Sequence, residues 1–277
     1  MADGPILPPP AGAAVRAPVF LFSAGWRSGS TLLQRMITAS GEVLIWGESG
    51  GALEMFANAM ECYAQMLGPG EKRYKFGFGG NGALQYEELR ASGPEGVHKW
   101  VACVTPPEVT FDHAFRDFFD AVYGRPAADL GYPNWGVKSV ICGIDSARFL
   151  RRIYPAAKFL FLVRNPVDCL TSIKRRNWMD HPRDVDPLSH FAGRWRRLAE
   201  EFRTADFGYS VRYEDLVASP EHLSPLAEYL EIGSIPRDFT RTSRVDWAPA
   251  NDKPLTFVER WRLLKIVGDE MREYGYT

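Results

Sequence analysis

The chain alternates short, continuous apolar runs with longer segments in which apolar residues recur every three or four positions. Continuous apolar runs are typical of strands buried on both faces of a sheet, whereas the three-to-four spacing is typical of helices. The pattern predicts strands at Pro18–Ala24, Val43–Trp46, Val97–Val104, Trp135–Val140, Ala157–Val163 and Tyr209–Tyr213. Strands separated by helices predict an α/β fold, a single domain with a mostly parallel central sheet flanked by helices.

Helical patterns fill most of the chain between and after these strands. They cover Ser30–Ala39, Ala52–Met66, Val109–Tyr123, Ser146–Tyr154, Val167–Asn177, Pro187–Phe207, Glu221–Glu231 and Thr256–Tyr274. Asp145 is expected to cap the helix that starts at Ser146, and Pro166 to open the helix that follows the strand ending at Val163. We expect residues 1–17, rich in Pro, Ala and Gly, to be a disordered leader, and residues 18–277 to form the domain.

The segment Phe20–Met36 has the order strand, tight loop, helix. Its loop reads Gly-Trp-Arg-Ser-Gly-Ser-Thr. Backbone N–H groups and a helix N-terminus meet at such a loop, and together they bind an anion. Arg27 adds a positive charge, and hydroxyl donors come from Ser28, Ser30 and Thr31. The sequence therefore predicts a site for a phosphate-like group.

This loop differs from that of the nucleotide triphosphatases, which reads G-x-x-x-x-G-K-S/T. Here only three residues separate Gly25 from Gly29, and Ser30 stands where that motif has its lysine. The sequence also shows no clear apolar run that ends in an Asp of the kind that holds Mg²⁺ in those enzymes. The pattern favours an anion site without a metal, with Arg27 as its cation.

A second basic pattern follows the most apolar strand, Ala157–Val163. Arg164 comes directly after this strand, and the next helix carries Ser172 and Arg176 four residues apart, on one face. Because ligands of parallel α/β sheets bind at the carboxyl ends of the strands, we expect both anion sites at the same edge of the sheet. The alternative interpretation is a solvated basic face around Lys174.

Together the two motifs resemble those of sulfotransferases that use 3′-phosphoadenosine 5′-phosphosulfate (PAPS). The resemblance runs over residues 20 to about 230 and implies a P-loop-NTPase-like fold. It implies that the first loop wraps the 5′-phosphosulfate, through Arg27, Ser28, Gly29, Ser30, Thr31 and Leu32. Arg164 and Ser172 have the R-x7-S spacing with which the family holds the 3′-phosphate. Arg176 matches a further basic contact, and Tyr213, in the segment VRYEDL, matches the tyrosine near the adenine.

The resemblance also implies in-line sulfuryl transfer to a hydroxyl, which needs a base on the attacking side. Glu48, in a glycine-flanked loop after a predicted strand, is the candidate base; the ordinary alternative is an acid favoured by the N-terminus of the next helix. His98 is the rival base.

Arg27 is expected to stabilise the leaving group. Lys138 matches a family lysine that contacts the bridging oxygen or the sulfonate, and its ordinary alternative is a lysine that snorkels at a strand end.

Charge and cysteine content limit the partners. The net charge of -1 creates no global field that recruits nucleic acid or an anionic membrane, and no apolar run is long enough to span a membrane. The four cysteines are widely spaced without metal-ligand spacing, so we expect buried free thiols and a cytoplasmic protein. The segment Gly68–Gly82, rich in glycine and aromatic residues, predicts either a substrate lid or a plain surface loop.

The predicted reaction therefore has PAPS as sulfuryl donor, adenosine 3′,5′-bisphosphate (PAP) as product and no metal. The predicted acceptor is a hydroxyl-bearing small molecule, lipid or sugar. The sequence leaves two other functions open: a P-loop nucleotide or small-molecule kinase, and a nucleotide-binding module without catalysis. It leaves the oligomeric state open as well.

Overall fold

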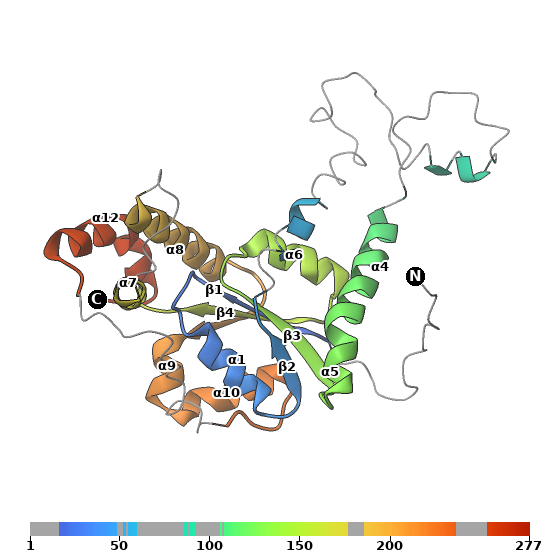
Figure 1. Cartoon of the computed structure of the whole chain (residues 1–277), viewed down its shortest axis with the longest axis horizontal. Coiled ribbons are helices and arrows are strands. Elements are labelled where there is room, and N and C mark those ends of the chain that lie inside the picture. The colour runs from blue at the N-terminus through green and yellow to red at the C-terminus, as the bar shows by residue number, and fades with distance from the viewer. Residues whose placement is uncertain are drawn as a thin grey trace, which may run out of the picture.

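A sheet of five strands, in the order β2-β3-β1-β4-β5, organises the chain (Figure 1). The computed structural model describes residues 17–48, 108–176, 186–236 and 254–277, together with residue 106 and short helical pieces within 52–59 and 86–93. The strands are β1 (Val19–Ser23), β2 (Val43–Trp46), β3 (Asn134–Ser139), β4 (Lys158–Val163) and β5 (Tyr209–Arg212). All neighbouring strands pair in parallel, which confirms the predicted α/β class.

Helices cover both faces of this sheet. They are α1 (Ser30–Thr38), α4 (Glu108–Phe119), α5 (Arg125–Asp129), α6 (Ile144–Ile153), α7 (Pro166–Arg175), α8 (Pro187–Arg203), α9 (Tyr213–Ala218), α10 (Leu223–Leu230) and α12 (Phe257–Glu273). A π-helical turn, Asp120–Gly124, joins α4 to α5, and a 3-10 turn, Pro220–His222, precedes α10.

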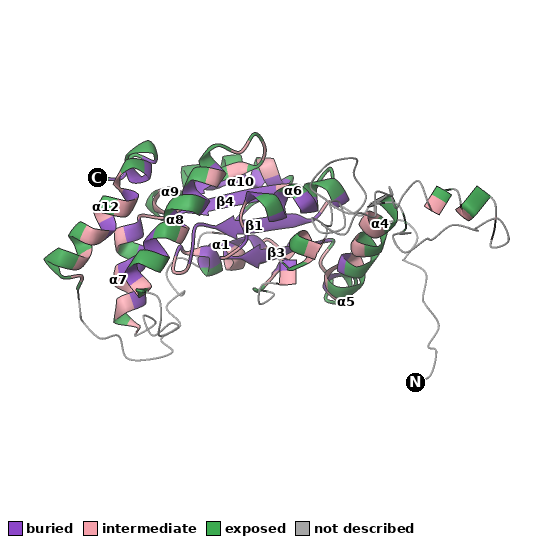
Figure 2. Cartoon of the chain, turned by 90° about the horizontal axis from the view of Figure 1, so that it is seen from above, coloured by how far each residue is buried: buried purple, intermediate pink, exposed green. Residues whose placement is uncertain are grey.

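Strand β1 shows why the central strands are apolar at every position. Phe20 and Phe22 pack on one face of the sheet with buried residues of α6, α8 and α12, whereas Val19 and Leu21 pack on the other face with residues of α1, α9 and α10. Every residue of β1 is buried as a result. Figure 2 shows the buried strands between helices whose outer sides are exposed.

Several helix boundaries differ from the sequence predictions. Pro166 does open α7, and the side chain of Asn165 accepts a hydrogen bond from the Val167 amide at 2.9 Å. Asp145 was expected to be a cap, and this was wrong: α6 begins at Ile144, whose amide donates to the carboxylate of Glu201 on α8 at 3.0 Å. A distant carboxylate therefore takes the place of the local cap.

The predicted strand ending at Tyr213 is one residue too long. Strand β5 ends at Arg212, and Tyr213 begins α9, a short helix that the sequence pattern does not predict. Glu214 and Asp215 lie in the first turn of α9, where the helix dipole favours negative charge. The predicted helix Glu221–Glu231 is likewise divided into the 3-10 turn and α10.

Some predicted elements lie in parts of the chain that the structure does not describe. The strand Val97–Val104, the segment Gly68–Gly82 and most of the leader lie outside the described residues. Cys142 and Cys169 are buried, and neither is part of a disulfide. Within the part of the chain that the structure describes, no helix has both the length and the apolar character needed to cross a membrane.

Candidate active site

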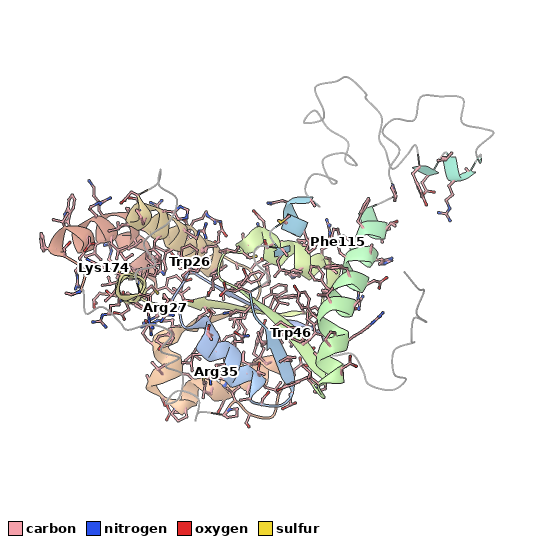
Figure 3. The ribbon with its side chains drawn as sticks, in the orientation of Figure 1. Trp26, Arg27, Arg35, Trp46, Phe115 and Lys174 are labelled. Carbon is pink, nitrogen blue, oxygen red and sulfur yellow. The ribbon has the colours of Figure 1, made fainter. Side chains whose placement is uncertain are left out.

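The carboxyl ends of the parallel strands lie along one edge of the sheet. The loop that contains Arg27 follows β1, Glu48 follows β2, Arg164 follows β4 and Tyr213 follows β5. Figure 3 shows Trp26 and Arg27 at this edge, on the side where α7 and α8 pack. The two basic motifs thus meet at a common edge, as their positions after parallel strands predicted.

Arg27 is held in an unusual backbone conformation. Its φ of 62° lies in the left-handed region, which is costly for a residue with a side chain. Its carbonyl oxygen accepts hydrogen bonds from Nη1 of Arg164 at 3.1 Å and from Sγ of Cys169 at 3.6 Å. Its side chain donates through Nε to Oγ of Ser172 at 2.9 Å. Residues of the second motif therefore fix both the backbone and the side chain of Arg27.

Gly29 is required at its position for two reasons. Its φ is 88°, and a Cβ atom added there would lie 2.1 Å from Cδ2 of Tyr213. The guanidinium carbon of Arg164 lies 4.2 Å from the centroid of the same Tyr213 ring. The ring is therefore packed against Gly29 and stacked with Arg164, and it connects the first motif to the second.

Two buried polar atoms at this edge have no hydrogen-bond partner in the described structure. They are Oγ of Ser28, a residue with 0% exposure, and Nε of Arg164. Leaving such a group unpaired costs about 1–3 kcal/mol, so these atoms are suited to a ligand that accepts hydrogen bonds. Gly29 caps α1 without a side-chain hydrogen bond, which leaves the N-terminus of that helix open to an anion.

Charge at the site favours an anion as well. Burial lowers the pKa of Arg27, and the positive charges of Arg176 and Arg164 lower it further. Several guanidinium groups thus repel one another in a partly buried place, and a bound anion would offset that repulsion. The residues present fit a nucleotide that carries phosphate groups.

A buried lysine connects the first loop to the candidate base. Lys138, on β3, is 5% exposed. Its Nζ lies 3.0 Å from Oε1 of Glu48 and 3.2 Å from Oγ1 of Thr31. The side chain of Glu48 is 46% exposed, so its carboxylate is open to a molecule arriving from solvent. This arrangement places an acid and a cation beside the N-terminus of α1.

The remaining predicted residues lie as follows. Ser30 is buried in the first turn of α1, and the Leu32 amide donates to the carbonyl of Gly29 at 2.9 Å while its side chain packs in the core. Arg176 follows α7 as its C-cap. His98 lies outside the described residues. Among the residues that are described, no three His, Cys, Asp or Glu side chains gather as metal ligands.

Two groups at this edge were not singled out from the sequence. Cys169 donates to the carbonyl of Arg27, and burial raises the pKa of its thiol to about 12. Glu214 accepts a hydrogen bond from the Asn165 amide at 3.0 Å. The available signal for Glu214 was its place directly after Tyr213, whereas nothing in the local sequence marks Cys169.

Comparison with known proteins gives a match over most of the chain. The family model described as "Sulfotransferase family" matches residues 18–233. No curated protein matches the chain.

Several solved sulfotransferase structures are similar to this one. A sulfotransferase domain from the curacin biosynthetic pathway is 15% identical, covers 95% of this chain and 98% of its own, and has a TM-score of 0.49. The sulfotransferase domain of the Synechococcus PCC 7002 olefin synthase is 20% identical, with coverages of 97% and 98% and a TM-score of 0.47. A sulfotransferase from Alicyclobacillus acidocaldarius is 15% identical, with coverages of 93% and 94% and a TM-score of 0.47. At these low scores the structures add nothing about function beyond the family match.

Proposed function

Because the chain belongs to the sulfotransferase family, we propose that it transfers the sulfuryl group of PAPS to a hydroxyl of a small molecule, lipid or sugar. PAP is the other product, and no metal takes part. Cys169, a buried cysteine outside any disulfide, supports a cytoplasmic location.

The first loop is proposed to hold the 5′-phosphosulfate. Arg27 supplies the charge, and backbone N–H groups and the hydroxyls of Ser30 and Thr31 supply hydrogen bonds. Ser28 contributes a buried Oγ that has no partner among the described residues. These donors lie at the N-terminus of α1, whose dipole adds to the attraction.

The second motif is proposed to hold the 3′-phosphate. In the described part of the chain Nε of Arg164 has no hydrogen-bond partner, and Ser172 lies on α7 with Arg176 directly after that helix. Tyr213, whose ring packs on Gly29, is proposed to lie near the adenine. This assignment predicts that Arg164→Ala weakens binding of PAP more than binding of adenosine 5′-phosphate.

Glu48 is proposed to be the base. When bound, PAPS supplies the electrophilic sulfur and a phosphate leaving group. The acceptor hydroxyl would lose its proton to the Glu48 carboxylate as its oxygen bonds to sulfur and the bond between sulfur and the 5′-phosphate oxygen breaks, which releases PAP. Lys138 orients this carboxylate by the 3.0 Å contact, and its charge offsets the negative charge that spreads over the transferring group.

The observation that carries the proposal is the position of Lys138 between the base and the loop. Its Nζ contacts both Glu48 and Thr31, so the proposed attacking side and the proposed donor side share one ammonium group. A module that only binds nucleotide has no need of an exposed carboxylate joined to the anion loop in this way.

The test is Glu48→Gln, with Glu42→Gln as the matched control. Glu42 precedes the same strand at its other end, where its carboxylate accepts a hydrogen bond from Gly233 at 2.6 Å. PAP formation from PAPS is measured with a panel of alcohols, phenols and sugars, and PAP binding is measured by calorimetry. We expect turnover to fall by about 100-fold or more in Glu48→Gln alone, with PAP affinity nearly unchanged.

Retained turnover in Glu48→Gln would exclude this glutamate as the base. A thermal-shift comparison addresses the kinase alternative, because a ligand that binds only the folded form raises the melting temperature. PAP without metal should raise it, and ATP with Mg²⁺ should raise it less. The reverse order would favour a kinase.

A further inference from the structure

Glu214 uses both of its carboxylate oxygens to join segments far apart in the sequence. It lies in the first turn of α9, directly after Tyr213. Oε1 accepts a hydrogen bond from the Asn165 amide at 3.0 Å, and Oε2 accepts one from the Tyr276 hydroxyl at 2.8 Å. One carboxylate thus connects the turn between β4 and α7, the start of α9 and the segment after α12.

Tyr276 is built into this contact rather than lying loosely on the surface. It is 6% exposed, and the guanidinium carbon of Arg212 lies 4.9 Å from the centroid of its ring. Burial raises the pKa of Tyr276, and the negative charge of Glu214 raises it further. The phenol therefore remains a neutral hydrogen-bond donor to Glu214 at any physiological pH.

The peptide group between Arg164 and Asn165 is held from both sides. Its carbonyl oxygen accepts a hydrogen bond from Nε1 of Trp195 at 3.0 Å, and its N–H donates to Glu214. Because the peptide is planar, these two hydrogen bonds fix the carbonyl carbon of Arg164, one of the backbone atoms that determine where its side chain leaves the Cα. Rotation of the plane would therefore displace the guanidinium group that stacks on Tyr213.

We propose that Glu214 and Tyr276 are positioning residues that orient Arg164 toward the 3′-phosphate of the nucleotide. The proposal rests on the proposed function, since it takes Arg164 as the group that binds this phosphate. Neither Glu214 nor Tyr276 is proposed to touch the nucleotide. Tyr276 holds the Glu214 carboxylate in place, and Glu214 fixes the peptide that carries Arg164.

The test is Tyr276→Phe, with Tyr274→Phe as its matched control. Tyr274 is 8% exposed, and its hydroxyl donates to the carbonyl of Ala199 on α8 at 2.9 Å. Each variant removes one buried hydroxyl from the same segment, so each should lower the melting temperature by a similar amount. Only Tyr276→Phe removes a contact to Glu214.

Binding of PAP and of adenosine 5′-phosphate is measured by calorimetry for the full chain. Tyr276→Phe should lower the preference for PAP over adenosine 5′-phosphate by about 5-fold, because a hydrogen bond to a charged group is lost. Tyr274→Phe should leave this ratio unchanged. Equal ratios in the two variants would overturn the proposal, since a purely structural hydroxyl changes stability but not the choice between nucleotides.

Arg164→Ala and the unaltered protein separate this proposal from the one on which it rests. If the unaltered protein binds both nucleotides equally, the assignment of the 3′-phosphate site fails and the positioning role fails with it. The unaltered protein could instead prefer PAP, with this preference lost in Arg164→Ala and kept in Tyr276→Phe. In that case the 3′-phosphate site is supported and only the positioning role is wrong.

Glu214→Gln provides a second variant should Tyr276→Phe not fold. The amide oxygen of Gln accepts one of the two hydrogen bonds, and its NH₂ group cannot accept the other. The preference for PAP should fall as in Tyr276→Phe, and the double variant should fall no further than Glu214→Gln alone. Additive losses would show that the two residues act separately and would contradict the proposal.

Discussion

Nε of Arg27 donates a hydrogen bond of 2.9 Å to Oγ of Ser172, a residue 145 positions later in the chain. The contact joins the loop after β1 to helix α7, which follows β4. Because β1 and β4 are neighbouring parallel strands, both segments start from the same edge of the sheet. The two basic motifs therefore form one site, and each part of that site can be tested separately.

Lys138→Met should remove catalysis while leaving much of the nucleotide affinity. Nζ of Lys138 contacts Glu48 and Thr31. The variant therefore leaves the Glu48 carboxylate without this ion pair, and it removes the positive charge that would lie beside the transferring sulfuryl group. We expect turnover to fall by about 100-fold, the scale for loss of one preorganised electrostatic contact. PAP formation and PAP binding, measured side by side, check this. A normal turnover number in Lys138→Met would mean that the lysine only packs at the end of β3.

Ser28→Ala should weaken nucleotide binding without lowering the stability of the ligand-free protein. The buried Oγ of Ser28 has no hydrogen-bond partner within the part of the chain that the structure describes, so the variant removes an unsatisfied polar atom. We expect PAP affinity to fall by about 10-fold, and the free energy of unfolding in urea to stay equal or rise.

Ser40→Ala is the matched control for Ser28→Ala. The hydroxyl of Ser40 donates to the Ile37 carbonyl at 2.6 Å and accepts from the Glu42 amide at 3.2 Å, beyond the other end of α1. This variant should lose about 1 kcal/mol of stability and keep its PAP affinity. If Ser28→Ala behaves in the same way, the Ser28 hydroxyl has a structural role only.

Gly29→Ala should weaken PAP binding more than Gly41→Ala does, although both glycines have positive φ angles, 88° and 77°. The strain of a left-handed residue costs each variant about 1 kcal/mol. Among the described residues, a Cβ at Gly41 meets no atom within 4 Å, whereas at Gly29 it would lie 2.1 Å from the Tyr213 ring. We expect only Gly29→Ala to lose PAP binding, as measured by calorimetry. Equal effects would mean that the Tyr213 ring does not pack on the loop in solution.

Glu259→Gln should show that the ion pair between Glu259 and Lys174 adds to the free energy of unfolding by an amount that depends on pH. Burial raises the pKa of Glu259, but hydrogen bonds from Lys174 and Thr256 outweigh it, and the pKa is lowered overall. A carboxyl with a lowered pKa in the folded state stabilises the protein above its unfolded pKa, and this stabilisation is lost as the pH falls through the folded value. Glu259→Gln should therefore be less stable than the unaltered protein at pH 7, and the difference should shrink below about pH 4.

Urea denaturation across this pH range checks the Glu259 prediction, with Glu228→Gln as a control for the change in charge. Glu228 is exposed on α10, whereas Lys174 lies on α7. A constant difference between Glu259→Gln and the unaltered protein at all pH values would contradict the assigned ion pair.

Local pattern was enough to find most of the elements that build the site. The apolar runs around Val19–Ser23 and Lys158–Val163 are strands because each is buried on both faces, and burial leaves a direct mark on composition. The loop from Gly25 to Thr31 was found for a similar reason, since glycines and hydroxyl residues at a strand end are a short-range signal. The cap of α6 was misplaced because the carboxylate that accepts from the Ile144 amide belongs to Glu201, which is far away in the sequence. The short helix α9 was missed as well.

The sequence by itself determined that this protein has a parallel α/β sheet with two basic motifs at strand ends, because hydrophobic period and turn chemistry are properties of neighbouring residues. Only the tertiary structure decided that Arg27 meets Ser172, that Tyr213 lies against Gly29, and that Lys138 joins Glu48 to Thr31. These contacts follow from the strand order β2-β3-β1-β4-β5, and that order depends on how whole helices and strands pack together.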